Sequence, residues 1–207
     1  MSRALRVSTW VALGVLVGLT VAVVAVDGPL PGEIGLIRRL QSFGEPVPTF
    51  ADIVRATTGT EGNLVVGAPA GVWLVARHGR TGWAVVVVCL ASMLIVQPVS
   101  KELIDRDRPD ESQVEVRADH SSRAYPSGHS LSTATTWGAA ALYASRTGRR
   151  RLAGALTVPI VCTALASGIH GVHWASDAIA GTLMGLGAAW LAIEQVAPNR
   201  PHERGGG

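Results

Sequence analysis

The chain has 207 residues and a formal net charge of +3, a length that fits one domain or two small ones. Only 16% of the residues are charged, against about 25% in typical soluble domains, and 48% are hydrophobic, so the composition excludes a disordered chain. Two cysteines are too few for a disulfide-stabilised scaffold. Lys101 is the one lysine among 18 basic residues.

Uncharged runs long enough for membrane helices dominate the sequence. They cover residues 7–26, 62–76, 81–100, 124–145, 152–176 and 178–193. Because a helix needs about 20 apolar residues to cross a bilayer, these runs predict an all-α, polytopic membrane protein with six transmembrane helices. The alternative is a soluble helical bundle. Its helices would carry charge on one face, and neither the first nor the third run has any.

The first two runs and the segment between them need separate treatment. The first could be a cleaved signal peptide, because Arg3 and Arg6 precede it, but its apolar stretch exceeds the usual length and we expect a retained helix. Residues 33–43 have helical apolar spacing, which predicts a short amphipathic helix on the outer surface. The second run spans a bilayer only if its helix begins near Phe50 and carries charged residues, including Arg55, in its outer half.

The arginines favour one side of these helices. That side collects Arg3, Arg6, Arg77, Arg80, Arg146, Arg149, Arg150, Arg151, Arg200 and Arg204. The opposite loop, residues 101–123, carries five basic and seven acidic residues. The positive-inside rule therefore places both termini in the cytoplasm and the 101–126 loop outside. We expect one membrane domain over residues 1–197 and a disordered cytoplasmic tail over residues 198–207.

The third run ends in a charged cluster that includes Lys101 and Arg108. These two residues are seven apart, so on a continued helix both side chains would point the same way. Together they can hold phosphate oxygens. The alternative is a solvated loop in which arginines pair with neighbouring carboxylates.

The fourth run opens with Pro126, Ser127, Gly128 and His129. Pro-Ser-Gly before an apolar run is typical of a helix start, whose free backbone N–H groups bind anions. Ser127 adds a hydroxyl donor, and His129 adds a titratable group in the first turn. The alternative is ordinary N-capping by Ser127 beside an incidental histidine.

His170, His173 and Asp177 lie where the fifth and sixth runs meet. His173 and Asp177 are four apart, so on a helix they would share a face. A nearby carboxylate fixes the tautomer of an imidazole and makes its other nitrogen a better nucleophile or base. The alternatives are a surface ion pair and a metal site made of these three residues and His129.

Taken together and in this order, the clusters resemble the type-2 phosphatidic acid phosphatase superfamily of membrane lipid phosphate phosphatases. Its motifs are a Lys, six residues and Arg-Pro; then Pro-Ser-Gly-His; then Ser-Arg, five residues, His, three residues and Asp. The matching residues are Lys101, Arg108 and Pro109; Pro126, Ser127, Gly128 and His129; and His173 and Asp177. The resemblance covers the motifs and the helix order from about residue 50 to residue 195.

The resemblance implies a role for each matched residue. His173 would attack phosphorus and form a phosphohistidine, Asp177 would orient and charge-stabilise it, and His129 would protonate the leaving alkoxide and then help to activate water. The groups that would bind the phosphate oxygens are Lys101, Arg108, Ser127 and the Gly128 backbone N–H. The resemblance implies no metal and no cofactor.

One position departs from the third motif. Its Arg falls on Ser167 and its Ser on Ala166, so one phosphate-contacting guanidinium is missing. Losing such a donor typically costs about 10²- to 10³-fold in rate. We therefore expect either a substitute or a weakened activity, and the candidate substitutes are His170, Arg123 and Arg117.

The leading hypothesis is a metal-independent integral phosphatase of the plasma membrane that acts on a polyprenyl or glycerolipid phosphate or diphosphate at the extracytoplasmic face. Its partners would be the lipid substrate and the bilayer, with no nucleic acid. The alternatives are a lipid phosphotransferase and a catalytically impaired homologue that only binds lipid phosphates. A vanadate-binding haloperoxidase shares the motifs, but those enzymes are soluble.

Overall fold

The computed structural model describes residues 3–26, 28–43, 47–119 and 122–194, and within these ranges it is all-helical, with no strand. The expected tail, residues 198–207, lies outside them. The elements are α1 (Arg3–Val26), α2 (Glu33–Gln41), α3 (Val47–Thr58), α4 (Thr60–His78), α5 (Arg80–Ala91), the π-helix η1 (Ser92–Val96), α6 (Gln97–Ile104), α7 (Gly128–Arg146), α8 (Arg150–Ala155), α9 (Val158–Ile169) and α10 (Ala175–Glu194).

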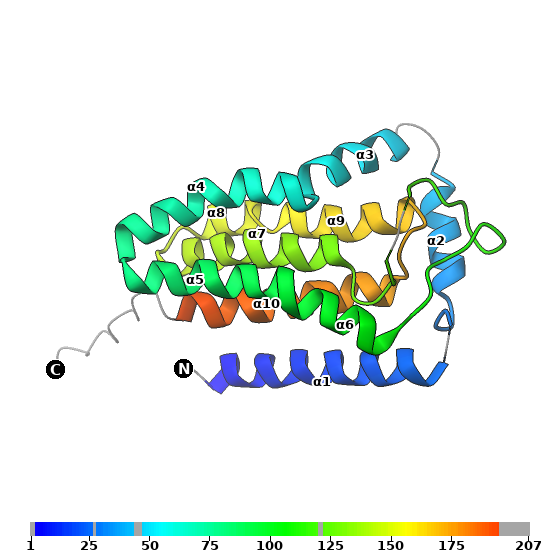
Figure 1. Cartoon of the computed structure of the whole chain (residues 1–207), viewed down its shortest axis with the longest axis horizontal. Coiled ribbons are helices and arrows are strands. Elements are labelled where there is room, and N and C mark those ends of the chain that lie inside the picture. Colours follow the sequence, from blue (N-terminus) through cyan, green and yellow to red (C-terminus); the bar gives the residue numbers. More distant parts are fainter. Residues whose placement is uncertain (1–2, 27, 44–46, 120–121, 195–207) are drawn as a thin grey trace.

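The long helices run back and forth along one axis of the molecule (Figure 1). The beginning of α1, the turn between α4 and α5 and the last turn of α10 lie at one end. At the other end, α2 crosses the bundle beside the long loop that joins α6 to α7. All three chemistry-bearing clusters belong to this second end, because they end α6, begin α7 and precede α10.

Helix α7 is central and packs most closely on α10. A Cβ atom at Gly181 would overlap the carbonyl oxygen of Ser127, and one at Gly185 would overlap that of Leu131. These two glycines form a G-x-x-x-G pattern, which lets helix backbones approach closely in membrane proteins. The pattern thereby brings the start of α7, with Ser127, against the first turns of α10.

Three expected helices are interrupted in the structure. The second run does not form one helix from Phe50, because α3 ends at Thr58 and α4 begins at Thr60, with Gly59 extended between them. The third run passes through the π-helix η1. The fifth run divides into α8 and α9 around Leu156 and Thr157. The amphipathic segment at residues 33–43 is a helix, as predicted, over Glu33–Gln41.

Three helical stretches are long and apolar enough to cross a membrane. They are Arg80–Ile104, Arg150–Ile169 and Ala175–Glu194, with mean hydropathies of 2.1, 1.9 and 1.3. A shorter apolar helix covers Trp10–Val26. Helix α7 is less apolar because hydroxyl side chains of its first turns, such as Thr133 and Thr135, are buried and hydrogen-bonded inside the bundle.

Candidate active site

The sequence cluster after the third run is folded differently from the expected continued helix. Helix α6 ends at Ile104, and Asp105 takes the left-handed conformation with φ 50°. Lys101 and Arg108 therefore do not share a helix face, and that part of the prediction is wrong. Their side chains nevertheless meet, because both donate hydrogen bonds to the Ser122 hydroxyl, from Lys101 Nζ at 2.9 Å and Arg108 Nη2 at 3.3 Å.

Backbone carbonyls of the loop before α7 fix these two cations further. Lys101 Nζ donates to the Arg123 carbonyl at 2.6 Å, and Arg108 Nε donates to the Ser122 carbonyl at 2.6 Å. Lys101 is buried. A buried ammonium and a half-buried guanidinium held by neutral groups are a positive site rather than the solvated loop of the alternative interpretation.

His173 faces this positive site. Arg108 Nη1 lies 3.1 Å from His173 Nε2 and 2.6 Å from the Val172 carbonyl oxygen. Since a guanidinium can only donate, we assign the lone pair to Nε2 and the proton to Nδ1. His173 Nδ1 lies 3.5 Å from Asp177 Oδ2, longer than a normal hydrogen bond. The unprotonated nitrogen is thus the one turned to the cations.

Asp177 is held at the start of α10. The helix begins at Ala175, so His173 precedes it and the expected shared helix face is wrong. Instead, Asp177 Oδ2 accepts a 2.8 Å hydrogen bond from the Trp174 backbone N–H. This contact resembles one of the two hydrogen bonds of a capping box, in which the side chain at N3 accepts from the backbone N–H of the N-cap residue. His173 and Asp177 are both buried, which argues against a surface ion pair.

A buried ion network that the sequence analysis missed lies behind Asp177. Arg106 Nη1 donates to Asp177 Oδ1 at 2.6 Å and to Ser176 Oγ at 2.6 Å. Arg106 Nη2 donates to Glu33 Oε2 at 2.9 Å, and Glu33 Oε1 accepts from the Ser176 backbone N–H at 2.8 Å. The sequence feature that could have indicated this network is Glu33, an acidic residue in the amphipathic helix. The Glu33 side chain is buried in the structure.

The start of α7 supplies the second cluster. Ser127 is fully buried and is the N-cap of α7, where its Oγ accepts from the Ser130 N–H over a long 3.5 Å. Its own N–H donates to the Asp177 carbonyl at 3.0 Å. Gly128 lies close to Gln97, and a Cβ there would displace the end of the Gln97 side chain. Because Ser127 bonds to Asp177 and Arg108 lies beside His173, the three clusters meet at this end of the bundle, with His129 in the first turn of α7.

Burial sets the charge states of the groups outside the long helices. It lowers the pKa of His173 to about 4, although Asp177 opposes the shift. It also lowers the pKa of Arg108 to about 10, which leaves the guanidinium charged at neutral pH. At neutral pH the site therefore presents a neutral imidazole beside a cation, the combination that a nucleophile for an anionic substrate needs.

The candidate substitutes for the missing arginine are engaged elsewhere. His170 Nε2 pairs with Asp52 Oδ1 at 2.8 Å, Arg123 forms ion pairs with Asp105 and Asp107, and Arg117 Nη2 pairs with Glu115 at 2.7 Å. Ser167 is buried and donates to the Thr163 carbonyl at 3.0 Å along its own helix.

The alternative metal site would need His129, His170, His173 and Asp177 together. Among the residues that the structure describes, no three His, Cys, Asp or Glu side chains form such a group. His170 is paired instead with Asp52.

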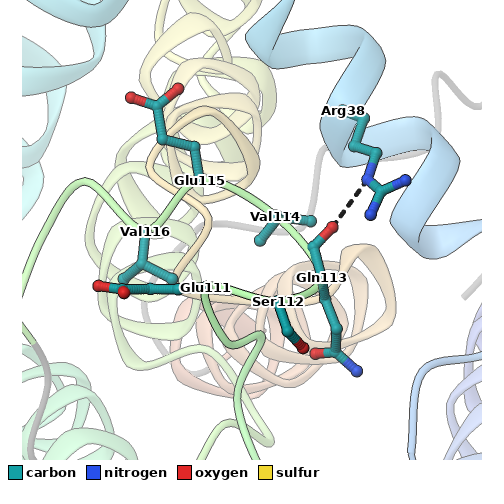
Figure 2. A pocket seen from close by; sticks show the side chains of 7 residues that line it. All are labelled: Arg38, Glu111, Ser112, Gln113, Val114, Glu115 and Val116. Carbon is teal, nitrogen blue, oxygen red and sulfur yellow. Dashed lines mark hydrogen bonds between the residues drawn. The ribbon is translucent and has the colours of Figure 1, made fainter.

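A separate hollow of about 460 Å³ lies on the outer loop (Figure 2). It is lined by Arg38, Glu111, Ser112, Gln113, Val114, Glu115 and Val116, none of which belongs to the three clusters. At one side of it, Arg38 Nε donates a hydrogen bond to the Gln113 carbonyl at 2.7 Å, which joins α2 to the loop. We therefore assign the hollow to the contact between α2 and the loop and not to the phosphate site.

The model of the PAP2 superfamily matches residues 82–201. A crystal structure of a transmembrane PAP2-type phosphatidylglycerolphosphate phosphatase from Bacillus subtilis has a similar fold, with a TM-score of 0.75 and 18% sequence identity. The similarity covers 89% of this chain and 93% of that one. No curated protein matches the chain significantly.

Proposed function

Because the chain belongs to the PAP2 superfamily, we propose that it is an integral membrane phosphatase that hydrolyses a lipid phosphate or diphosphate through a phosphohistidine. The observation that carries this proposal is the position of His173. Its unprotonated Nε2 lies 3.1 Å from the Arg108 guanidinium, and Asp177 lies behind its other nitrogen. A neutral nucleophile beside a cation is suited to attack on an anionic phosphate.

The reaction would proceed in two displacements. His173 Nε2 attacks phosphorus, a P–N bond forms, and the P–O bond to the lipid oxygen, or to the lipid-linked phosphate of a diphosphate, breaks. The imidazolium form of His129 gives a proton to the departing oxygen and becomes neutral. His129 then takes a proton from water, the water oxygen attacks phosphorus, and the P–N bond breaks to release inorganic phosphate. Asp177 stabilises the positive charge that His173 carries in the intermediate.

Cations and N–H groups would hold the transferred phosphoryl group. We assign this role to Lys101, Arg108, Ser127 and the Gly128 N–H, which lie at the same end of the bundle. Phosphoryl transfer depends mainly on positioning and on stabilising charge at the equatorial oxygens. We propose that these protein donors supply that charge without a metal ion.

Large apolar side chains on the outside of the bundle support a place in the bilayer. Leu103, Val65, Val72 and Leu94 are 77%, 74%, 71% and 69% exposed. The soluble bundle of the alternative interpretation would place charged residues there. We propose six membrane crossings, with both termini in the cytoplasm and the site at the extracytoplasmic face of the plasma membrane, as the arginine distribution indicates.

A lipid is the substrate that this location favours. The site lies at the end of long apolar helices, so a phosphate head group can reach it while its chains stay in the bilayer. Phosphatidylglycerolphosphate, named for the structural neighbour, represents the glycerolipid class. Polyprenyl phosphates and diphosphates represent the other class that we propose.

One observation favours an impaired homologue as the second candidate. Ser167 replaces the third-motif arginine of the family and is buried with its hydroxyl bonded to Thr163. A site that lacked this donor and had no replacement would bind lipid phosphates with little turnover.

Phosphate release separates these candidates. The purified full-length chain would be incubated in mixed micelles with phosphatidic acid, phosphatidylglycerolphosphate, and polyprenyl mono- and diphosphates, each with and without EDTA. We expect release that survives EDTA and is abolished by His173→Ala. Binding of these lipids without release would support the impaired homologue, and loss of release with EDTA would contradict the metal-independent mechanism.

A further inference from the structure

The end of α3 reaches the candidate site from a helix that belongs to none of the three motif clusters. Arg55 lies one turn before Gly59, and the Gly59 N–H donates to the Arg55 carbonyl at 2.9 Å. A Cβ atom built on Gly59 would lie 3.5 Å from His129 Nε2. Gly59, which directly follows α3, therefore lies beside His129, and the absence of a side chain at Gly59 leaves the ring nitrogen space.

Arg55 is electrostatically coupled to the same groups. The charge of Arg55 acts on His129, as do the charges of His173 and Arg108. Arg55 also acts on Arg108, where its charge adds to the effect of burial on the Arg108 pKa. Three cations, Arg55, Arg108 and Lys101, thus act on one imidazole.

These cations are not neutralised in the way that the other arginines of this end are. Arg106 and Arg123 each pair with two carboxylates. Within the described ranges, no carboxylate lies within 4.0 Å of the Arg55 or Arg108 guanidinium, and Arg55 Nη2 donates only a long, 3.4 Å hydrogen bond to the Asp119 carbonyl. The charge of Asp177 opposes the mutual effect of these cations on Arg108 and Lys101, and an anion bound between the cations would lower their repulsion further.

Apolar packing and an ion pair hold α3, the helix that carries Arg55, against α9. Ala51 and Val54 are buried against Ala166 of α9. One turn from Arg55, Asp52 pairs with the buried His170 at 2.8 Å. Helix α3 therefore packs on the same helix, α9, that carries Ser167, and it can deliver a guanidinium from the neighbouring element.

We infer that Arg55 is a phosphate-binding residue of this site and supplies the guanidinium that position 167 lacks. The inference rests on the proposed function, because it assigns a further donor to the same phosphoryl group. Its fork of N–H donors would bind equatorial oxygens beside His129, while Arg108 binds them beside His173.

Two measurements on the full-length chain test this inference. The first is the binding of orthovanadate, a phosphate analogue, followed by calorimetry. The second is phosphate release from the lipid panel. The variants are Arg55→Ala, Arg55→Gln, which keeps part of the side chain without its charge, and Arg55→Lys, which keeps the charge without the fork. Arg39→Ala is the matched control, because Arg39 is an exposed arginine on α2 at the same end of the bundle.

We expect Arg55→Ala and Arg55→Gln to weaken vanadate binding about 10- to 100-fold, as loss of a charge-assisted hydrogen bond does. We expect kcat/KM to fall about 10²- to 10³-fold, with Arg55→Lys between these variants and wild type and Arg39→Ala unchanged. Wild-type vanadate affinity in Arg55→Ala and Arg55→Gln would overturn the inference. If the wild-type chain released no phosphate but bound vanadate through Arg55, the inference would stand and the proposed hydrolysis would fail.

Discussion

Arg106 Nη1 and Asp177 Oδ1 are joined by a 2.6 Å hydrogen bond in which both side chains are buried. The pair connects the loop that follows α6 to the first turn of α10. Because Asp177 also faces His173, this contact links the candidate nucleophile to Glu33 on α2, the second carboxylate bound by Arg106. The orientation of His173 thus depends on residues from three separate segments.

Removing Arg106 tests the importance of that network for stability. Arg106→Ala would leave two buried carboxylates unpaired, so we expect the free energy of unfolding to fall by about 3–5 kcal/mol. Thermal and denaturant unfolding in detergent measure the change. Arg123→Ala is the control, since its ion pairs are exposed and such pairs contribute about 0–1 kcal/mol. Equal effects of the two substitutions would contradict the structural role of Arg106.

Asp177→Asn probes the carboxylate behind His173. The amide keeps the shape but loses the negative charge that stabilises the phosphorylated imidazole, so we expect kcat to fall about 10²- to 10⁴-fold. The measurement is steady-state phosphate release. Because residues that act as a unit are not additive, the double variant with His173→Ala should be no slower than His173→Ala alone. A further drop would show that Asp177 acts separately.

The protonation of His173 gives a prediction about pH. Burial lowers its pKa to about 4, so the ring is neutral above that pH and becomes a cation only as the pH falls through about 4. We expect the imidazole signals, assigned with His173→Ala, to titrate near pH 4 in an NMR titration. Because kcat/KM reports ionisations of the free enzyme, it should also decrease as the pH falls through about 4. Titration near pH 6.5 would contradict the buried, cation-facing position.

Alanine substitutions at two glycines of α10 test the close packing of α7 on α10. A Cβ at Gly181 would overlap the Ser127 carbonyl, whereas one at Gly187 meets nothing within 4 Å. We expect Gly181→Ala to lower the free energy of unfolding by about 1–3 kcal/mol and to reduce activity, because it displaces the start of α7. Gly187→Ala should be neutral or slightly stabilising. Similar unfolding curves for the two variants would contradict this packing.

The proposed topology is tested with single cysteines in a background of Cys89→Ala and Cys162→Ala. Ser112→Cys lies in the loop between α6 and α7, and Thr147→Cys lies between α7 and α8, both at exposed positions. We expect an impermeant maleimide to label Ser112→Cys in right-side-out vesicles and Thr147→Cys only after permeabilisation. The reverse pattern would place the site in the cytoplasm.

The lengths of the apolar runs predicted the all-helical architecture, because long uncharged runs are typical of helices that are buried in lipid or protein. The breaks inside those helices were not predictable in the same way. The chain is interrupted at Gly59, between α3 and α4, and α6 ends at the left-handed turn of Asp105. Hydrophobic periodicity reports average local preference and does not locate such breaks.

Motif spacing predicted His129, His173, Asp177, Lys101 and Arg108 as site residues, and the structure places Arg108 beside His173 and both Lys101 and Arg108 on the Ser122 hydroxyl. The spacing could not place residues that reach the site from other helices. Glu33 and Arg55 lie in segments whose sequence indicates only a surface helix and the outer half of a membrane helix. The Glu33 network and the role that we propose for Arg55 both depend on packing between distant segments, which one sequence does not encode as a pattern.

The most direct test of a phosphohistidine mechanism is to trap the intermediate. The chain would be mixed with a ³²P-labelled lipid phosphate, quenched within milliseconds in alkaline detergent and mapped by peptide mass spectrometry. We predict an acid-labile, alkali-stable label on His173 that is absent from His173→Ala and accumulates when His129→Ala slows its hydrolysis. Phosphate release that persists at the wild-type rate in His173→Ala, with no labelled histidine, would contradict the account.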